Sequence, residues 1–194
     1  MINFNKEKNV KEYLEEYSSL EEYVLGKDIN EKYIAKNKIA IIDCDGVITT
    51  GKSFYSQDGK SLKAYGCYDK EMLKFLAKNC NWDFLFVSDD QKGFNITSAR
   101  LNDIGFPLVK ASPDERRKIV EQYNSTDAIT IFIGDSLSDI PALVEAKYNG
   151  TTCDAPDKIK KLCNYVPERK CGEGALAEIL ENLHMYLSKT VFKR

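Results

Sequence analysis

IAIIDCDGVITTGKSF, residues 39–54, begins with four apolar residues that lead directly into Asp43 and Asp45. A continuous apolar run of this kind is typical of a strand covered on both faces, as in a parallel sheet. Ligands of open α/β sheets bind outside the carboxyl ends of the strands. The two aspartates are therefore expected at the edge of the sheet where a ligand site forms.

Similar apolar runs alternate with helical patterns along the rest of the chain. Strands are predicted at 39–43, 83–88 and 128–134. Helical spacing of apolar residues occurs at 69–79, 93–104, 114–123, 138–146 and 174–187. This alternation predicts an α/β fold with a doubly wound parallel sheet.

Two segments lie outside this alternation. Residues 6–25 carry apolar side chains at helical spacing, so we expect residues 1–37 to form a helical extension to a domain of residues 38–194. Asp58-Gly59 separates two strand-like runs, which predicts a β-hairpin over about 50–68. A hairpin that follows the first strand so closely would overhang the two aspartates.

Composition excludes several functional classes. The 194 residues are 43% hydrophobic, and 28 Lys and Arg nearly balance 30 Asp and Glu without forming basic blocks. We therefore expect no nucleic-acid or anionic-membrane partner, while a small anionic substrate stays possible. The sequence has no apolar run of membrane-spanning length and begins without a signal-peptide core, so a cytoplasmic location is expected.

Cysteine and histidine usage narrows the catalytic chemistry. The six cysteines form no C-x-x-C pair, which favours reduced and mostly buried thiols over a disulfide framework. His184 is the only histidine, so serine–histidine and cysteine–histidine catalysis and His-rich zinc sites have little support. Carboxylates are therefore the groups expected to carry any acid–base catalysis.

The ends of the three predicted strands carry most of the polar side chains that could form a site. The first strand ends in Asp43-x-Asp45-Gly, the second in Ser88-Asp-Asp, and the third in Gly-Asp135-Ser-x-x-Asp139. Each cluster alone could be a helix cap or a turn, but together they predict one site. Crowded carboxylates repel one another unless a cation lies among them, and oxygen ligands suit Mg²⁺. The expected chemistry is magnesium-assisted phosphoryl transfer.

DCDGVIT, the serine at the end of the second strand and GDSLSD together resemble the haloacid dehalogenase superfamily of phosphatases. The stretch from Asp43 to Asp69 and residues 154–180 are similar to one subgroup, the phosphatases of eight- and nine-carbon sugar acids. The resemblance covers roughly residues 38–183. It implies a Rossmann-like core with a small hairpin cap, and hydrolysis of a sugar or sugar-acid phosphate.

The resemblance also implies catalytic roles. Asp43 would be the nucleophile that forms an aspartyl-phosphate, and Asp45 would protonate the leaving oxygen and later activate water. Residues i and i+2 of a strand share a face, so the two carboxylates can flank one phosphorus. Ser88 would bind the phosphate, and the cation that the transition state needs would be Arg116, with Lys118 as the competing candidate.

Magnesium ligands follow from the same resemblance. Asp43, the backbone carbonyl of Asp45, and Asp135 would hold Mg²⁺, with Asp139 in the shell around it. A phosphotransferase or mutase would use the same residues and differ only in the acceptor. A phosphate-binding protein without catalysis is the third alternative, which the retention of these residues disfavours.

The residues that would contact the substrate match the subgroup less completely than the catalytic residues do. Lys63 and Asp69 are retained and are candidate substrate contacts, although a hairpin lysine could equally be solvated. Asp90 and Ala177 stand where relatives often carry arginine. The glycine-rich segment around Glu173 reaches a neighbouring subunit's site in relatives, so we expect a homo-oligomer, a tetramer above all, with Glu173 near the substrate.

Overall fold

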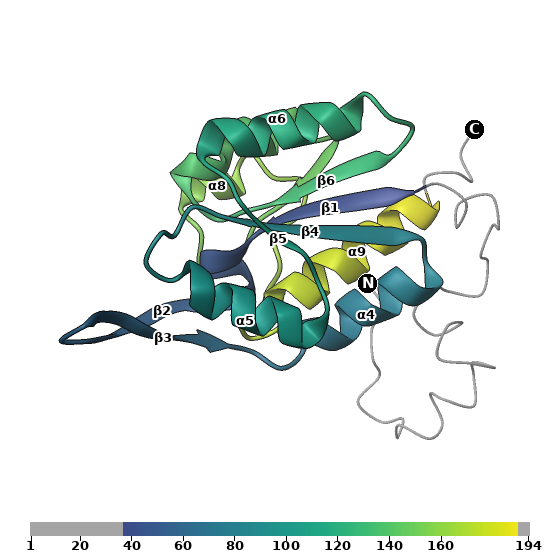
Figure 1. Ribbon diagram of the computed structural model, residues 1–194. Helices are drawn as coiled ribbons and strands as arrows, with labels where there is room; N and C mark the ends of the chain where they lie inside the picture. Colours follow the sequence, from purple (N-terminus) through teal and green to yellow (C-terminus); the bar gives the residue numbers. More distant parts are fainter. Residues whose placement is uncertain (1–36, 190–194) are drawn as a thin grey trace, which may run out of the picture.

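A parallel five-stranded sheet forms the centre of the computed structural model, which describes residues 37–189 (Figure 1). The strand order is β5-β4-β1-β6-β7, and every neighbouring pair is parallel. The strands are β1 (Lys38–Asp43), β4 (Trp82–Ser88), β5 (Leu108–Lys110), β6 (Ile129–Ile133) and β7 (Tyr148–Gly150). The first strand in sequence therefore lies in the middle of the sheet.

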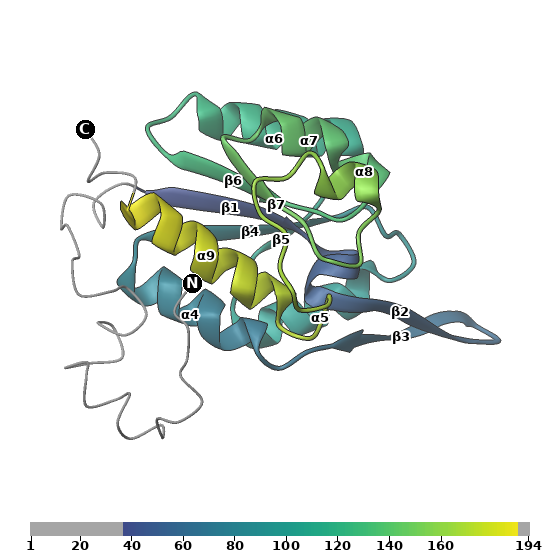
Figure 2. The same cartoon turned by 180° about the vertical axis from the view of Figure 1, so that it is seen from behind.

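Helices cover both faces of this sheet. One face packs against α4 (Asp69–Asn79), α5 (Phe94–Ile104) and α9 (Ala175–Lys189). The other packs against α6 (Pro113–Asn124), α7 (Ile140–Glu145) and α8 (Asp157–Lys160). Figure 2 shows α4 and α9 side by side below the sheet, with α6, α7 and α8 above it.

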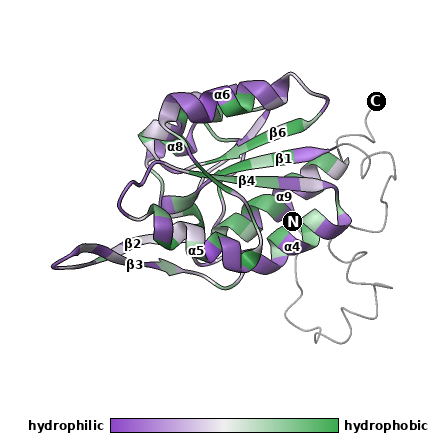
Figure 3. Cartoon of the chain, viewed as in Figure 1, coloured by the Kyte–Doolittle hydropathy of each residue, from purple (hydrophilic) through white to green (hydrophobic). Residues whose placement is uncertain are grey.

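The two hydrophobic cores explain the unbroken apolar run at residues 39–42. Ala40 and Ile42 point into the core under α4 and α9, whereas Ile39 and Ile41 point into the core under α6 and α7. Successive side chains of a strand alternate between faces, so a strand buried on both sides has to be apolar throughout. In Figure 3 the central strands are accordingly green and the outer surface of α6 is largely purple.

A β-hairpin projects from the carboxyl end of β1 (Figure 1). A short π-type turn, Cys44–Ile48, leads into β2 (Thr49–Ser56), which pairs antiparallel with β3 (Gly59–Tyr65). Three large apolar side chains of this hairpin are more than half exposed: Phe54, Tyr55 and Leu62.

The α/β class, the doubly wound sheet and the hairpin are confirmed, and the predicted strands and helices lie within two residues of the observed ones. A 3₁₀ turn, Leu137–Asp139, takes the first two residues of the helix predicted over 138–146 and precedes α7. The three-residue strands β5 and β7 and the short helix α8 were missed, because three or four residues are too few to show a period. The helix expected over 6–25 lies outside the described residues.

The expectations for membrane-spanning segments and for the cysteines can also be compared with the structure. None of the helices described for residues 37–189 is long and apolar enough to cross a membrane. All six cysteines are free thiols; three of them are buried and Cys67 is exposed.

Candidate active site

Three carboxylates meet where β1 and β6 end. Asp43 is the last residue of β1, Asp135 follows β6, and Asp139 closes the 3₁₀ turn before α7. One carboxylate oxygen from each of them lies within 4.8 Å of the other two. The neighbouring strands are in register up to Ile42 and Ile133, so their carboxyl ends present these side chains at the same edge.

Two glycines make room for these carboxylates. Gly46 has φ +84°, and a Cβ at this position would lie 2.1 Å from Oδ2 of Asp135. A Cβ on Gly134 would lie 2.5 Å from Cγ of Asp139. The DCDG and IGDS glycines therefore permit a close approach of backbone and carboxylate that any side chain would block.

Arg116 is the cation of this cluster. It is 4% exposed, and its Nη1 lies 3.2 Å from Oδ1 of Asp43 and also binds Asp139. Its Nε donates to the backbone carbonyl of Ala111 at 3.1 Å, which orients the guanidinium. Lys118, two residues further along α6, is exposed. The helix thus directs Arg116 toward Asp43 and leaves Lys118 on the surface.

Arg116 pairs with two of the three carboxylates, Asp43 and Asp139, so the cluster holds more carboxylates than cations. Burial and the neighbouring Asp139 raise the pKa of Asp43 well above its usual value, although Arg116 acts in the opposite direction. Burial and Asp139 likewise raise the pKa of Asp135 to about 7. Oδ1 of Asp135 is buried without a hydrogen-bond partner among residues 37–189. Such a site would be stabilised by a further cation.

Asp45 faces the hairpin. Its Oδ2 accepts a hydrogen bond from Nζ of Lys63 at 2.7 Å, while its side chain keeps 36% of its surface exposed. The Lys63 side chain is fully buried and also donates to Thr97 Oγ1 at 2.9 Å. Lys63 is therefore neither solvated nor open to substrate in this structure, and it positions the Asp45 carboxylate.

Ser88 is the last residue of β4, and together with Asp90, two residues further on, it completes this side of the site. Ser88 is buried, and its Oγ accepts a hydrogen bond from the Asp90 amide at 3.2 Å. The Asp90 carboxylate pairs with Lys60 and Lys63 of the hairpin. Burial raises the pKa of Asp90, but the hydrogen bonds from the two lysines outweigh burial and the pKa lies well below its usual value. In the sequence Asp90 stands out only as a departure from relatives, and no local signal links it to the hairpin.

Asp69 and Glu173 lie apart from the three carboxylates. Asp69 is buried at the start of α4, and its Oδ1 accepts a hydrogen bond from the Ala177 amide in the first turn of α9. Glu173 is exposed between Gly172 and Gly174, which both have positive φ. A Cβ on Gly172 would lie 2.7 Å from the Thr50 amide nitrogen, so this loop packs against the base of the hairpin.

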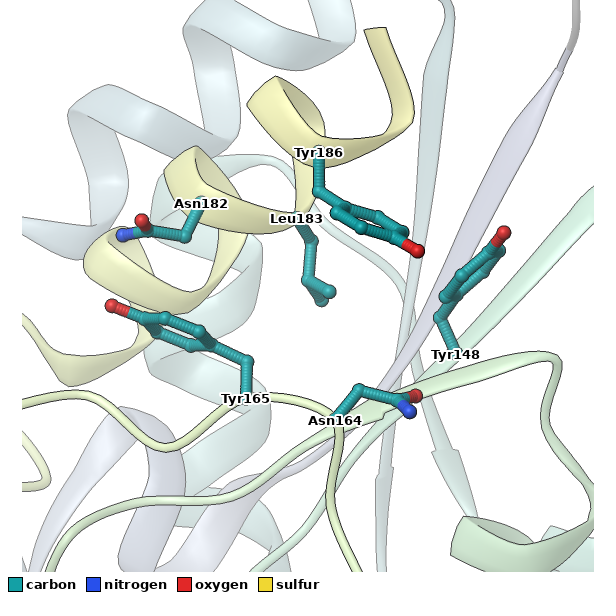
Figure 4. A pocket seen from close by; sticks show the side chains of 6 residues that line it. All are labelled: Tyr148, Asn164, Tyr165, Asn182, Leu183 and Tyr186. Atoms are coloured by element: carbon teal, nitrogen blue, oxygen red, sulfur yellow. The ribbon is translucent and has the colours of Figure 1, made fainter. Parts of the chain in front are cut away.

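A hollow of about 360 Å³ occurs between β7 and α9 (Figure 4). Its lining residues are Tyr148, Asn164, Tyr165, Asn182, Leu183 and Tyr186. None of the predicted site residues is among them, so this hollow is separate from the candidate active site.

A doubly wound parallel sheet with acidic groups at the ends of adjacent strands, and a hairpin beside them, is the arrangement that the resemblance to haloacid dehalogenase-type phosphatases implies. The 3-deoxy-D-manno-octulosonate 8-phosphate phosphatase of Haemophilus influenzae is 27% identical over 146 residues, which are 73% of this chain and 79% of the relative. The protein of the same name from Yersinia pestis is 21% identical over 151 residues, 76% of this chain and 79% of that relative. No protein-family model matches the chain.

Solved structures give the same result for the fold. The cobalt-bound octulosonate 8-phosphate phosphatase of H. influenzae superimposes with a TM-score of 0.69 at 22% identity, over 84% of this chain and 96% of that one. The Moraxella catarrhalis enzyme in complex with magnesium, phosphate and a KDO molecule gives a TM-score of 0.68 at 18% identity, over 89% of this chain and 95% of that one. The Rossmann-like fold, the resemblance to this phosphatase subgroup and the class of enzyme, a phosphatase, are confirmed.

Proposed function

We propose that this chain hydrolyses the phosphate monoester of a sugar or sugar acid, with Mg²⁺ and an aspartyl-phosphate on Asp43. One observation carries the proposal: one carboxylate oxygen each of Asp43, Asp135 and Asp139 lies within 4.8 Å of the other two, with Arg116 paired to Asp43. The similarity to sugar-acid phosphatases supports the substrate class. We assign the activity to residues 38–194, with residues 1–37 as an extension.

The donor set fits a divalent cation. One guanidinium pairs with Asp43 and Asp139, and Oδ1 of Asp135 has no hydrogen-bond partner among the residues described. Asp43, the carbonyl of Asp45, and Asp135 would hold Mg²⁺, with Asp139 positioned beside them by Ser136 and Arg116. When bound, the ion would neutralise the excess negative charge and polarise the phosphoryl group.

The residues of the chain then carry the reaction in two steps. The Asp43 carboxylate attacks phosphorus while Asp45 donates a proton to the departing sugar oxygen. Asp45 next accepts a proton from water as that water attacks the aspartyl-phosphate, which releases phosphate and restores Asp43. Arg116 orients the nucleophile and stabilises the phosphoryl charge, and Ser88 binds a phosphoryl oxygen.

Aryl phosphate turnover tests this mechanism. With Mg²⁺, purified protein should release phosphate steadily from para-nitrophenyl phosphate. Asp43→Asn should abolish turnover, because an amide cannot act as the nucleophile, and Asp45→Asn should slow it by roughly 100-fold to 10,000-fold. Substantial turnover in Asp43→Asn would contradict the mechanism.

Transfer to a different acceptor is the second candidate, because a phosphotransferase or mutase needs the same carboxylates. Adding a sugar alcohol acceptor during aryl phosphate turnover distinguishes the two activities. Free phosphate should account for all of the aryl alcohol released. A deficit of phosphate, matched by a phosphorylated acceptor, would identify a transferase.

We also propose that the chain forms a homo-oligomer, with a tetramer favoured. Exposed apolar side chains at the hairpin, Phe54, Tyr55 and Leu62, support a contact between subunits. Exposed Glu173, in the loop beside the hairpin base, is then available to a neighbouring subunit's substrate. Light scattering should give a mass above that of one chain, and Phe54→Ser with Leu62→Ser should lower it. A monomeric wild-type protein would refute the assembly.

A further inference from the structure

Two lysines and two aspartates form a closed cluster where the hairpin meets β4 and α5. Oδ2 of Asp90 accepts a hydrogen bond from Lys60 Nζ at 2.6 Å and is ion-paired with Lys63 Nζ at 2.8 Å. Oδ1 of Asp90 accepts from the Gly93 amide at 3.0 Å. Asp90 therefore ties both hairpin lysines to the end of β4.

Lys63 is fully engaged within the protein. An ammonium group has three N–H donors, and three protein oxygens surround this one. Nζ of Lys63 lies 2.7 Å from Asp45 Oδ2, 2.8 Å from Asp90 Oδ2 and 2.9 Å from Thr97 Oγ1, and the side chain is fully buried. A substrate carboxylate could bind this lysine only by displacing one of these partners.

The cluster is packed into the fold and is not a solvated surface pair. A Cβ on Gly93 would lie 2.3 Å from Asp90 Oδ2, 2.5 Å from Lys63 Cε and 2.8 Å from Lys60 Cδ. The Asp90 carboxylate and the aliphatic chains of the two lysines therefore occupy the space that a side chain at position 93 would fill. The Lys60 and Asp90 side chains are only 13% and 16% exposed.

The cluster of Lys60, Lys63, Asp45 and Asp90 forms one wall of the site, and the charges within this wall are balanced. Lys60 and Lys63 are matched by Asp45 and Asp90, and both lysines are engaged with carboxylates. The wall includes Asp45, the proposed proton donor to the leaving oxygen, so it borders the part of the substrate beyond the phosphate. A substrate carboxylate there would meet no net positive charge and no free partner in the buried Lys63, whereas hydroxyl groups need no charged partner.

We propose that Asp90 is a specificity-determining residue, which engages the hairpin lysines and selects the phosphate of an uncharged sugar or polyol over that of a sugar acid. This inference rests on the proposed phosphatase function and narrows its substrate class. Without Asp90 the two lysines would be available to a substrate carboxylate, and the preference would move toward the acid.

Competition against para-nitrophenyl phosphate tests the inference with two matched pairs of esters. One pair is glycerol 3-phosphate and 3-phosphoglycerate, and the other is glucose 6-phosphate and 6-phosphogluconate. The ratio of inhibition constants within each pair isolates the carboxylate, whether or not either ester is turned over. The wild-type protein should bind the uncharged member more tightly. In Asp90→Ala and Asp90→Asn, at least one ratio should move about tenfold toward the acid, the usual scale of a charged hydrogen bond.

A matched control and the other outcomes complete the test. Glu121→Gln makes the same change of charge at an ion pair with Arg117 within α6 and should leave both ratios unchanged. Ratios unchanged in the Asp90 variants, a wild-type preference for the acids, or no inhibition by any ester would each overturn the inference. An equal loss of affinity for both members would mean that Asp90 only anchors the hairpin, which also overturns it. Failure to hydrolyse the aryl phosphate would instead refute the proposed function.

Discussion

Replacing Arg116 with alanine should lower the turnover number far more than replacing Lys118. Arg116 is buried with its Nη1 3.2 Å from Asp43 and bound to Asp139, whereas Lys118 is exposed on the same helix. At an effective dielectric constant near 20, a pair of charges at this distance interacts by about 5 kcal/mol before desolvation is subtracted. Removing a preorganised charge of this kind typically costs about 3 kcal/mol in the transition state. The expected loss in turnover is therefore roughly 100-fold.

The dependence of turnover on Mg²⁺ concentration distinguishes a transition-state role of Arg116 from a merely structural one. Without Arg116 the three carboxylates of the site lose their compensating cation, so Arg116→Ala should bind Mg²⁺ more tightly while it turns over more slowly. The assay is steady-state hydrolysis of para-nitrophenyl phosphate over a Mg²⁺ titration, with melting temperatures measured in EDTA and in Mg²⁺. In EDTA, Arg116→Ala should melt well below the wild-type protein, and Mg²⁺ should narrow the gap.

Lys118→Ala is the matched control, and it should stay within about twofold of the wild-type turnover, as expected for an exposed helix charge. The reverse ranking of the two variants would refute the assignment of the cation to Arg116. Equal and mild losses in both would show that neither side chain stabilises the phosphoryl group.

Further substitutions test the packing and the electrostatics of the site. Gly46→Ala should reduce turnover at least about tenfold and raise the Mg²⁺ requirement, because the new Cβ would displace the Asp135 carboxylate. Gly105→Ala is the matched control: Gly105 has φ +85° but open space around it, so the substitution should cost only about 1 to 2 kcal/mol of stability. Mg²⁺ should raise the melting temperature of the wild-type protein, and Asp135→Asn should lose most of that increase. Burial raises the pKa of Asp69 to about 6, so the native state binds this proton more tightly than the unfolded state and loses stability as pH rises from about 4 to 6. Urea unfolding should therefore show Asp69→Asn gaining about 3 kcal/mol relative to the wild-type protein between pH 4 and pH 7, and a pH-independent difference would contradict this reasoning.

Local sequence determined the framework of this protein. The apolar run of residues 39–42 specifies a strand buried on both faces. Asp58-Gly59 marks the hairpin, whose turn lies at Gln57-Asp58 with Gly59 as the first residue of β3, and both signals depend on neighbouring residues alone. The carboxylates of the site were also predictable, since the carboxyl ends of parallel strands meet at one edge. Short strands could not be predicted in this way, because three residues show no period. The strands β5 and β7 are recognised only by their pairing with β4 and β6.

Only the tertiary structure decided which charged groups meet. Sequence alone left Arg116 and Lys118 as competing cations, and the rotation of α6 against the sheet directs one inward and the other to solvent. It could not show that Lys63 is saturated, because its partners Asp45, Asp90 and Thr97 come from three separate elements. Periodicity and turn signals act over a few residues, whereas ion pairs depend on how distant segments pack. The carboxylates of the candidate site could therefore be predicted from the sequence, and the charge balance beside them was set by the fold.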